Sequence, residues 1–410
     1  MAGSQNNKHA IHDVVIIGGG LAGAALAMTA ARMGLSVAVV EAQDTSSFAE
    51  TTPERVIALS HGSRCHLESL GVWQDVKRAG AAPIRKVHVL EPGNRGEVGM
   101  HRAEADVDAL GYVVQNAHIL KALYEQMPQQ VRVVSPAQLA GIELLDDCVR
   151  VQVRGDGDEQ TLQARLLVGA DGTMSRVRKF CGIGSRGWDH NRFGLVASVT
   201  PKNQHRDVAH ECFRPEGPLA FLPLDAGRYS IVWTLAPREA ARMSSLDDAA
   251  FMRALKIAAG QEMQAHLGGF VETGPRALFP FEYRVAERFT APRVALIGNA
   301  AHTMHPVAGQ GLNLGLRDVG DLSRALQRAV DGGRDIGAPI VLEEYAQQRT
   351  LDTASVTAFT EGLNAVFCND LLPVKLARGL GMAGMDRLPA LRSWLLRRAA
   401  GLAQQAGGAA

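Results

Sequence analysis

The residues with the most specific chemical pattern lie between Val294 and Asp318, where a strand pattern runs into a glycine-rich turn. The apolar strand ends at Gly298, and apolar residues recur at helical spacing from Leu312 onward. A helix that begins there presents unpaired N–H groups and the positive end of its dipole. Such a helix end stabilises negative charge on a flat ligand such as a reduced flavin. The sequence therefore predicts a flavin site, and the alternative is an ordinary strand-to-helix turn.

Three residues of this turn have backbone properties that suit a close ligand. Pro306 has a fixed φ and no N–H, while Gly309 and Gly311 let bare backbone approach a ring at angles that other residues resist.

A second glycine-rich turn follows the apolar strand Val14–Ile17. Gly18, Gly20 and Gly23 have the GxGxxG spacing, and a small-residue helix and a second strand lead to Glu41. This βαβ context predicts that a pyrophosphate binds at the helix N-terminus and that Glu41 binds a ribose. Two further GxGxxG matches, at 182–187 and 379–384, have no such context and are rejected. The apolar run 14–40 is long enough to cross a membrane, but its glycine cluster favours strand, helix, strand.

A third turn, Gly169-Ala-Asp171-Gly172, follows the strand pattern 162–168. Asp171 can accept hydrogen bonds from backbone N–H groups and brace nearby phosphates, whereas a plain Asx turn is the alternative. We expect the strands at 131–134, 149–153 and 162–168 to form a small sheet of their own. Arg55 is a candidate for contacting phosphates, with a surface arginine as the equal alternative, and Gln115 for contacting the ribityl chain.

Alternating apolar residues from 192 to 235, with turns between them, predict an antiparallel sheet between two of these cofactor-binding stretches. Such an inserted layer could hold a substrate against the flavin. Phe221, Pro223 and Trp233 are the pocket candidates, and core packing is the commoner role of strand aromatics.

Composition limits the function classes. The chain has 410 residues and a net charge of +1, which gives no indication of nucleic-acid binding. Its five cysteines form no C-x-x-C pair, so neither a disulfide framework nor a zinc site is predicted. The polar leader 1–10 lacks an apolar core, so we expect no signal peptide and a cytoplasmic location.

The C-terminal segment 371–410 is basic and amphipathic. It holds six basic side chains and one acidic one, a net charge of +5, and an apolar face of Leu388, Leu391, Trp394 and Leu395. Such a segment can lie on the inner face of an anionic membrane or on a partner protein. Packing onto the main body of the protein is the favoured alternative.

Three segments together resemble a known family. GGGLAG with Glu41, GADGTMSRVR and GNAAHTMHPVAGQGLNLGLRD have the order and spacing of flavin monooxygenases that resemble para-hydroxybenzoate hydroxylase. RVIALS, GPLAFLPL and GQGLNLGLRD look most like the ubiquinone-biosynthesis hydroxylases, especially 2-polyprenyl-6-methoxyphenol hydroxylase. The resemblance covers roughly residues 12 to 370.

The resemblance implies one FAD, with NADPH or NADH as electron donor. It places the first glycine turn and Glu41 on the ADP half, and it implies that Gly169, Asp171 and Gly172 serve FAD and NAD(P)H together. Residues 299–313 would surround the ribityl chain and ring, including Asn299, Leu312 and Asn313. The broader family usually has Asp at Asn299, and an amide can still bond a ribityl hydroxyl.

The resemblance also implies a mechanism. NAD(P)H reduces FAD, O₂ gives a C4a-hydroperoxyflavin, and one oxygen atom passes to an electron-rich, lipophilic phenol. The cofactor performs this chemistry, so no acid–base catalytic residues are predicted. His302 and His305 have i, i+3 spacing but no third convergent ligand, so no metal site is expected, and His305 is a candidate pocket residue.

The expected fold is α/β: a discontinuous Rossmann-like FAD-binding domain (11–85, 109–180 and 285–340), a substrate-binding β-sheet domain (86–108 and 181–284) and a helical C-terminal region (341–410). Two alternatives to the hydroxylase stay open. One is a hydroxylase or reductase of the same fold that acts on another aromatic or isoprenoid substrate. The other is a non-catalytic flavoprotein subunit. The oligomeric state is left open.

Overall fold

The computed structural model describes residues 11–50, 56–91, 97–304, 310–367, 392–393, 396–397 and 401. Its centre is a sheet with five parallel strands in the order β18 (Val294–Leu296), β11 (Glu159–Gly169), β1 (Ile11–Ile17), β2 (Val37–Val40) and β8 (Arg132–Val134). Helices cover the apolar strands, as is usual for parallel sheets, so the strands are nearly continuous runs of Val, Ile, Leu and Ala.

Antiparallel strands extend this sheet. β17 (Thr290–Ala291) pairs with β18, β10 (Val149–Arg154) pairs with the first part of β11, and β9 (Gln138–Leu144) pairs with β10. The expectation of a separate small sheet at 131–134, 149–153 and 162–168 is therefore wrong. β11 lies between β1 and β18 at the centre of the main sheet, because its apolar second half is buried on both faces.

Helices around this sheet connect the strands. α1 (Leu21–Arg32) joins β1 to β2, so the run 14–40 is strand, helix, strand. α8 (Gln310–Asp331) packs against both α1 and α9 (Pro339–Phe367), and the short α5 (Arg176–Phe180) follows β11. A three-stranded sheet of β3 (Val56–Ser60), β7 (Gly111–Gln115) and β4 (Ala81–Ile84) lies with α2 (His61–Ser69), α3 (Trp73–Gly80) and α4 (Asn116–Glu125).

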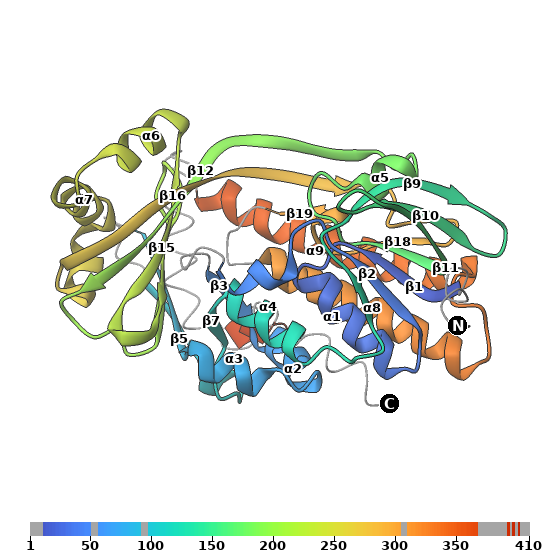
Figure 1. Ribbon diagram of the computed structural model, residues 1–410. Helices are drawn as coiled ribbons and strands as arrows, with labels where there is room; N and C mark the ends of the chain where they lie inside the picture. Colours follow the sequence, from blue (N-terminus) through green and yellow to red (C-terminus); the bar gives the residue numbers. More distant parts are fainter. Residues whose placement is uncertain are drawn as a thin grey trace.

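The second large sheet lies beside this α/β unit (Figure 1). Its order is β19 (His302–Thr303), β16 (Phe270–Ala286), β12 (Ser185–Pro201), β15 (Tyr229–Leu235), β14 (Leu219–Pro223), β13 (Val208–Cys212), β5 (Lys86–Leu90) and β6 (Glu97–His101). All neighbours are antiparallel except β13 and β5. The predicted inserted, mostly antiparallel sheet is confirmed, and β5 and β6 lie at one edge of it.

Two helices, α6 (Pro237–Ser245) and α7 (Asp248–Leu267), cover the outer face of this sheet (Figure 1). Phe251 and Leu255 of α7 form a second hydrophobic core with Leu90, Phe221 and Trp233 of the strands. On the opposite face, Leu222 packs with residues of β4 and β7. This inner face therefore looks toward the α/β unit.

Part of the C-terminal segment packs on the main body. The Arg392 guanidinium pairs with Glu104 at 2.6 Å, and Leu396 is buried beside Ala105 and Leu110. Leu388, Leu391, Trp394 and Leu395, the predicted apolar face, lie outside the described residues. Within the described part of the chain, no helix is both long and apolar enough to cross a membrane.

Candidate functional site

The first glycine-rich turn shows two different uses of glycine. Gly18 has φ +101°, and a Cβ there would overlap the Ala170 carbonyl, while a Cβ on Gly23 would overlap the carbonyl of Gly18. These two glycines permit close packing of the chain on itself. Among the described residues, a Cβ on Gly20 would meet no atom within 4 Å. The space in front of Gly20 is open at the start of α1, as a site for a ligand would be.

The N-terminus of α1 is suited to an anion. No side chain caps the helix at Gly20, and its first turn holds no acidic residue. The N–H groups and the positive dipole end are therefore available to phosphate oxygens. The three glycines expected to bind the pyrophosphate lie together, and their role stays a prediction.

Glu41 lies directly after β2, beside this turn. Its carboxylate accepts hydrogen bonds from the N–H of Gly19 at 2.6 Å and the N–H of Gln43 at 2.8 Å. A carboxylate has about four acceptor positions, so capacity for a ribose hydroxyl remains.

Tyr124, which the sequence analysis did not predict, also contacts the first glycine-rich turn. Its hydroxyl donates to the Gly19 carbonyl at 2.9 Å, and a Cβ on Gly19 would overlap that hydroxyl. Burial, aided by the nearby Glu41, raises the pKa of Tyr124, so the hydroxyl keeps its proton. A tyrosine within α4 carries no local pattern that points to a turn about a hundred residues earlier in the chain.

The Asp171 side chain binds the start of α5, the helix that follows it in the chain. Its carboxylate accepts hydrogen bonds from the Ser175 hydroxyl and from the N–H groups of Arg176 and Val177, at 2.5 to 3.1 Å. It therefore shapes the turn after β11, and any effect on a phosphate is indirect. Gly169 is needed for packing, because a Cβ would press on Val177 and Leu296, whereas Gly172 has φ +80° and open space around it.

The turns after β11 and β18 are tied together by a buried arginine. Arg178 of α5 donates to the carbonyls of Ala300 and Thr173, both at 2.8 Å. The hydroxyl of Thr303 also donates to that of Thr173 at 3.0 Å. Asn299, in the short helical turn η4 (Gly298–Ala300), is exposed at this edge. The carboxyl ends of three neighbouring parallel strands thus converge, which is where open α/β sheets bind ligands.

The start of α8 is anchored to β3. The Asn313 amide donates to the Ala58 carbonyl at 2.9 Å and accepts from the Ser60 N–H at 2.8 Å. The Asn313 side chain therefore joins α8 to β3, and a contact between Asn313 and the cofactor stays a prediction. Gly311 and Leu312 lie in the first turn, partly buried, and a Cβ on Gly311 would meet open space.

A buried cluster of charged side chains joins the start of α8 to the turn after β18 and to α9. Asp318 of α8 accepts from the Gly298 N–H and pairs with His302 Nε2, both at 2.7 Å, and with Arg349 Nε of α9 at 2.6 Å. Although burial favours the neutral acid, the interactions with His302 and Arg349 hold the pKa of Asp318 below its usual value. The His302 side chain therefore has a structural role, because its Nε2 atom pairs with Asp318. Asp318 could have been singled out as a charged residue on the apolar face of the predicted helix.

The remaining predicted cofactor residues are placed as follows. Gln115 ends β7 and is partly exposed next to the start of α4. Arg55, His305, Pro306 and Gly309 lie outside the described residues.

The three strand candidates for the substrate pocket need correction. Phe221 and Trp233 are 0% and 2% exposed and belong to the core under α7. Phe221 stacks on Phe270, and Trp233 lies 6.4 Å from Phe251 between ring centroids. Pro223 shares their face, two residues after Phe221 in the same strand. These side chains point away from the α/β unit. Side chains alternate along a strand, so the residues next to them, such as Leu222, lie on the inner face.

The residues at the sheet edge fit an adenine dinucleotide. The uncapped helix, the open space at Gly20 and the carboxylate of Glu41 match the pyrophosphate and ribose of such a molecule, while Gly311 leaves space at the start of α8.

Comparison with known proteins agrees with this geometry. The family described as "FAD binding domain" matches residues 12–360. The chain is 35% identical to ubiquinone hydroxylase UbiL of Rhodospirillum rubrum, covering 95% of this chain and 90% of that protein. It is 32% identical to 3-demethoxyubiquinol 3-hydroxylase of Escherichia coli, covering 95% and 98%.

A solved structure is similar over nearly the whole chain. The p-nitrophenol 4-monooxygenase PnpA of Pseudomonas putida superposes with a TM-score of 0.74 at 21% identity, covering 94% of this chain and 96% of that one. This likeness confirms the predicted fold class.

Proposed function

Because this chain belongs to the FAD binding domain family of FAD-dependent hydroxylases, we propose that it hydroxylates the ring of a polyprenylated phenol in ubiquinone biosynthesis. Its cofactor is FAD, and NADPH or NADH is the electron donor typical of the family. The similarity to ubiquinone hydroxylases over 95% of the chain supports the substrate class. The observation that carries the proposal is the convergence of the carboxyl ends of β1, β11 and β18, each followed by a glycine-containing turn, in the α/β unit beside the second sheet.

In this proposal the sheet edge holds FAD in two parts. Gly20 lets the pyrophosphate approach the start of α1, Gly18 and Gly23 let the turn pack closely on itself, and Glu41 binds the adenosine ribose. Gly172, Asn299 and the start of α8 at Gly311 and Leu312 lie toward the ribityl chain and ring. Asp171 holds the turn in shape through its bonds to Ser175 and α5.

FAD, when bound, would supply the chemistry that transfers one oxygen atom from O₂ to an electron-rich ring. The chain must then orient the ring and keep water away from the reaction. The N-terminus of α8 stabilises negative charge on the reduced ring system through its N–H groups and dipole. Asn313 and Asp318 keep that helix end in place through β3 and Gly298.

We place the phenol on the inner face of the second sheet. Val196 and Val232 are neighbours in β12 and β15, partly exposed, and their strand neighbours Leu195 and Trp233 point into the outer core. Ala220 of β14 pairs with Val232 on the same face. In this proposal the small apolar side chains here contact the lipophilic ring and the start of its prenyl chain. The C-terminal basic segment, or a partner in a quinone-biosynthesis complex, would bring the protein to the membrane that holds such a substrate.

Mass spectrometry of quinone extracts tests the substrate. In cells that lack this gene and are grown in air, we expect a polyprenylated phenol to accumulate and ubiquinone to fall, with recovery when the wild-type gene returns. A Gly20→Val gene should fail to restore ubiquinone. Unchanged ubiquinone in a strain with no second hydroxylase would reject the substrate, while the purified protein would still bind FAD.

A further inference from the structure

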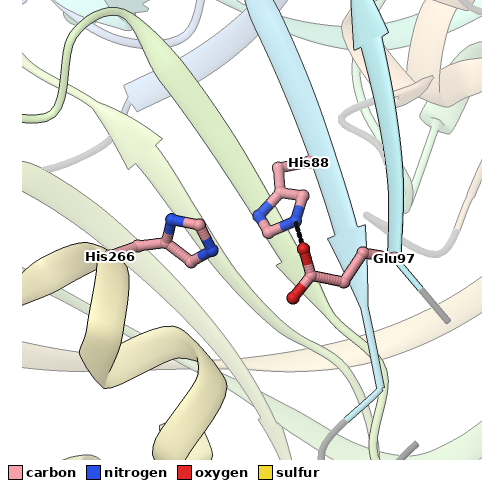
Figure 2. A group of neighbouring side chains, drawn as sticks. All are labelled: His88, Glu97 and His266. Atoms are coloured by element: carbon pink, nitrogen blue, oxygen red, sulfur yellow. Dashed lines mark hydrogen bonds and ion pairs between the residues drawn. The ribbon is translucent and has the colours of Figure 1, made fainter. Parts of the chain in front are cut away.

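A second group of ligand-type side chains lies in the outer layer of the molecule, away from the proposed flavin site. His88 of β5, Glu97 of β6 and His266 of the last turn of α7 each place one nitrogen or oxygen atom within 4.8 Å of the others. We propose that these three residues, the His–Glu triad, bind a divalent metal ion of the zinc class. Figure 2 shows the helix bringing His266 toward the two strand residues.

The distances are close to those that a metal ion needs. His88 Nε2 lies 3.1 Å from Glu97 Oε2. A tetrahedral zinc ion with bonds of ~2.1 Å holds its ligand atoms about 3.4 Å apart. The other pairs of ligand atoms lie within 4.8 Å, and Glu97 and His266 are both exposed, so we expect rotation of these two side chains to bring the three atoms to this spacing. Two imidazoles and one carboxylate leave a fourth position for water, as in other three-ligand zinc sites.

A further histidine orients the buried ligand. His88 Nδ1 lies at hydrogen-bond distance, 3.1 Å, from His210 Nδ1 of the neighbouring strand β13, and both rings are buried. This bond occupies Nδ1 and leaves Nε2, which faces Glu97, as the nitrogen of His88 that can bind a metal ion. Metal-ligating histidines in proteins usually make such a bond through their second nitrogen. His210 is therefore a positioning residue for the triad.

The triad is separate from the proposed flavin site. His88 alternates with Val87 and Val89 and shares its face with Leu90, which is part of the core under α7. The inner face, with Val87, packs instead on the α/β unit. A metal ion here would join the edge hairpin β5–β6 to the end of α7, so its role is structural and independent of the hydroxylation chemistry. The nearby Lys86 charge opposes a cation and is offset by Glu97.

Metal binding should be measured on the full, untagged, FAD-loaded protein after treatment with a chelator. Titration with Zn²⁺ by calorimetry should give one ion per chain, and Co²⁺ in its place should give the visible absorption of a nitrogen- and oxygen-ligated ion. His266→Ala should weaken Zn²⁺ binding by at least about a hundredfold, and Glu97→Gln should also weaken it. His210→Asn should cost about ten- to a hundredfold, as for other residues that support a ligand.

The matched control is His101→Ala, an exposed histidine at the other end of β6. It should bind Zn²⁺ like the wild type. Retained FAD absorbance and far-ultraviolet circular dichroism identify variants that are folded. The proposal is overturned if the wild type binds no Zn²⁺ stoichiometrically, or if folded His266→Ala and Glu97→Gln proteins bind it as tightly as His101→Ala. In that case the three residues form a hydrogen-bonded group only.

Discussion

At the residue scale, the glycines of the first turn divide by what surrounds them. Gly18, Gly19 and Gly23 are explained by contacts inside the protein, namely with Ala170, with Tyr124 and with Gly18 itself. Gly20 has no such contact with the described residues, and we propose that the bound ligand requires its small size. Within the GxGxxG pattern, Gly20 is therefore the position at which a substitution should affect ligand binding and leave the packing of the turn unchanged.

Gly20→Val should therefore abolish FAD retention and leave the fold intact. The valine side chain has room in the free protein and would occupy the approach of the pyrophosphate. Purified protein should be colourless, with unchanged circular dichroism. Gly362→Val is the control, since a Cβ on this exposed α9 glycine also meets nothing within 4 Å. A yellow Gly20→Val protein with full FAD occupancy would refute the assignment.

Glu41→Gln should weaken FAD binding while the strands stay in place. The variant loses the charged acceptor for both the Gly19 N–H and the proposed ribose hydroxyls. Hydrogen bonds to charged groups contribute about 1.5–3 kcal/mol each, so we expect roughly a tenfold or larger rise in the dissociation constant. Quenching of FAD fluorescence measures it. Unaltered affinity would remove Glu41 from the site.

Glu211 gives a pH dependence that can be checked at one residue. It lies in β13 on the face opposite His210, and burial raises its pKa from 4.5 to about 7. Between these values the folded protein binds more protons than the unfolded chain, so stability falls as the pH rises. One pKa unit corresponds to about 1.4 kcal/mol, and the partly exposed side chain reduces the expected effect to about 1–2 kcal/mol.

Glu211→Gln should accordingly raise the thermal midpoint at pH 8 and have much less effect at pH 5. The exposed Glu272→Gln serves as the control and should show no such difference. Equal shifts of the Glu211→Gln midpoint at both pH values would contradict the buried, proton-binding carboxyl.

At the element scale, one buried carboxylate connects three segments beside the proposed flavin site. Asp318 joins α8 to the Gly298 turn, to His302 of β19 and to Arg349 of α9, which also pairs with Asp321 and Asp352. Removing one member of a buried ion pair leaves its partner charged and desolvated. The position of the α8 N-terminus therefore depends on this cluster.

Asp318→Ala should destabilise the protein by about 3–5 kcal/mol, seen as a lower urea midpoint and a lower yield of folded protein. Asp331→Ala, at the exposed end of the same helix, should change stability by less than about 0.5 kcal/mol. If both variants unfolded at the same urea concentration, the buried cluster would not stabilise the junction.

The individual elements were largely predictable, and their pairing was less so. The βαβ unit at 14–40 follows from strand periodicity and the glycine cluster, because both are local. The place of β11 between β1 and β18 depends on partners more than a hundred residues away in each direction, and nothing within 162–168 specifies them. Similarly, an amide such as that of Asn313 has no local feature that distinguishes a bond to β3 from a bond to a ligand.

At the scale of the whole molecule, the second sheet has two faces with different neighbours. Alternation along β15 showed which residues share a face, but only the packing of α7 shows which face is the outer one. That is why Phe221 and Trp233, chosen for their aromatic rings, proved to be core residues, while the smaller Val232 lies on the side of the α/β unit. Large aromatic side chains are buried most often in cores.

Two neighbouring substitutions test this assignment of faces. Val232→Trp should fill the proposed pocket and lower kcat/KM for a lipophilic phenol by about tenfold or more, with FAD binding retained. Trp233→Phe should leave kcat/KM near the wild-type value and lower stability by about 1 kcal/mol. Steady-state oxygen uptake and thermal unfolding measure the two effects. The reverse pattern would place the substrate on the α7 side.

The most direct test of the hydroxylase function is isotope transfer from ¹⁸O₂ by the purified, FAD-loaded protein. With NADPH or NADH and a polyprenylated methoxyphenol, we predict a product that contains one ¹⁸O atom, detected by mass spectrometry, and no product without oxygen. Turnover of the phenol under anaerobic conditions, or a product whose added oxygen comes from water, would contradict the account.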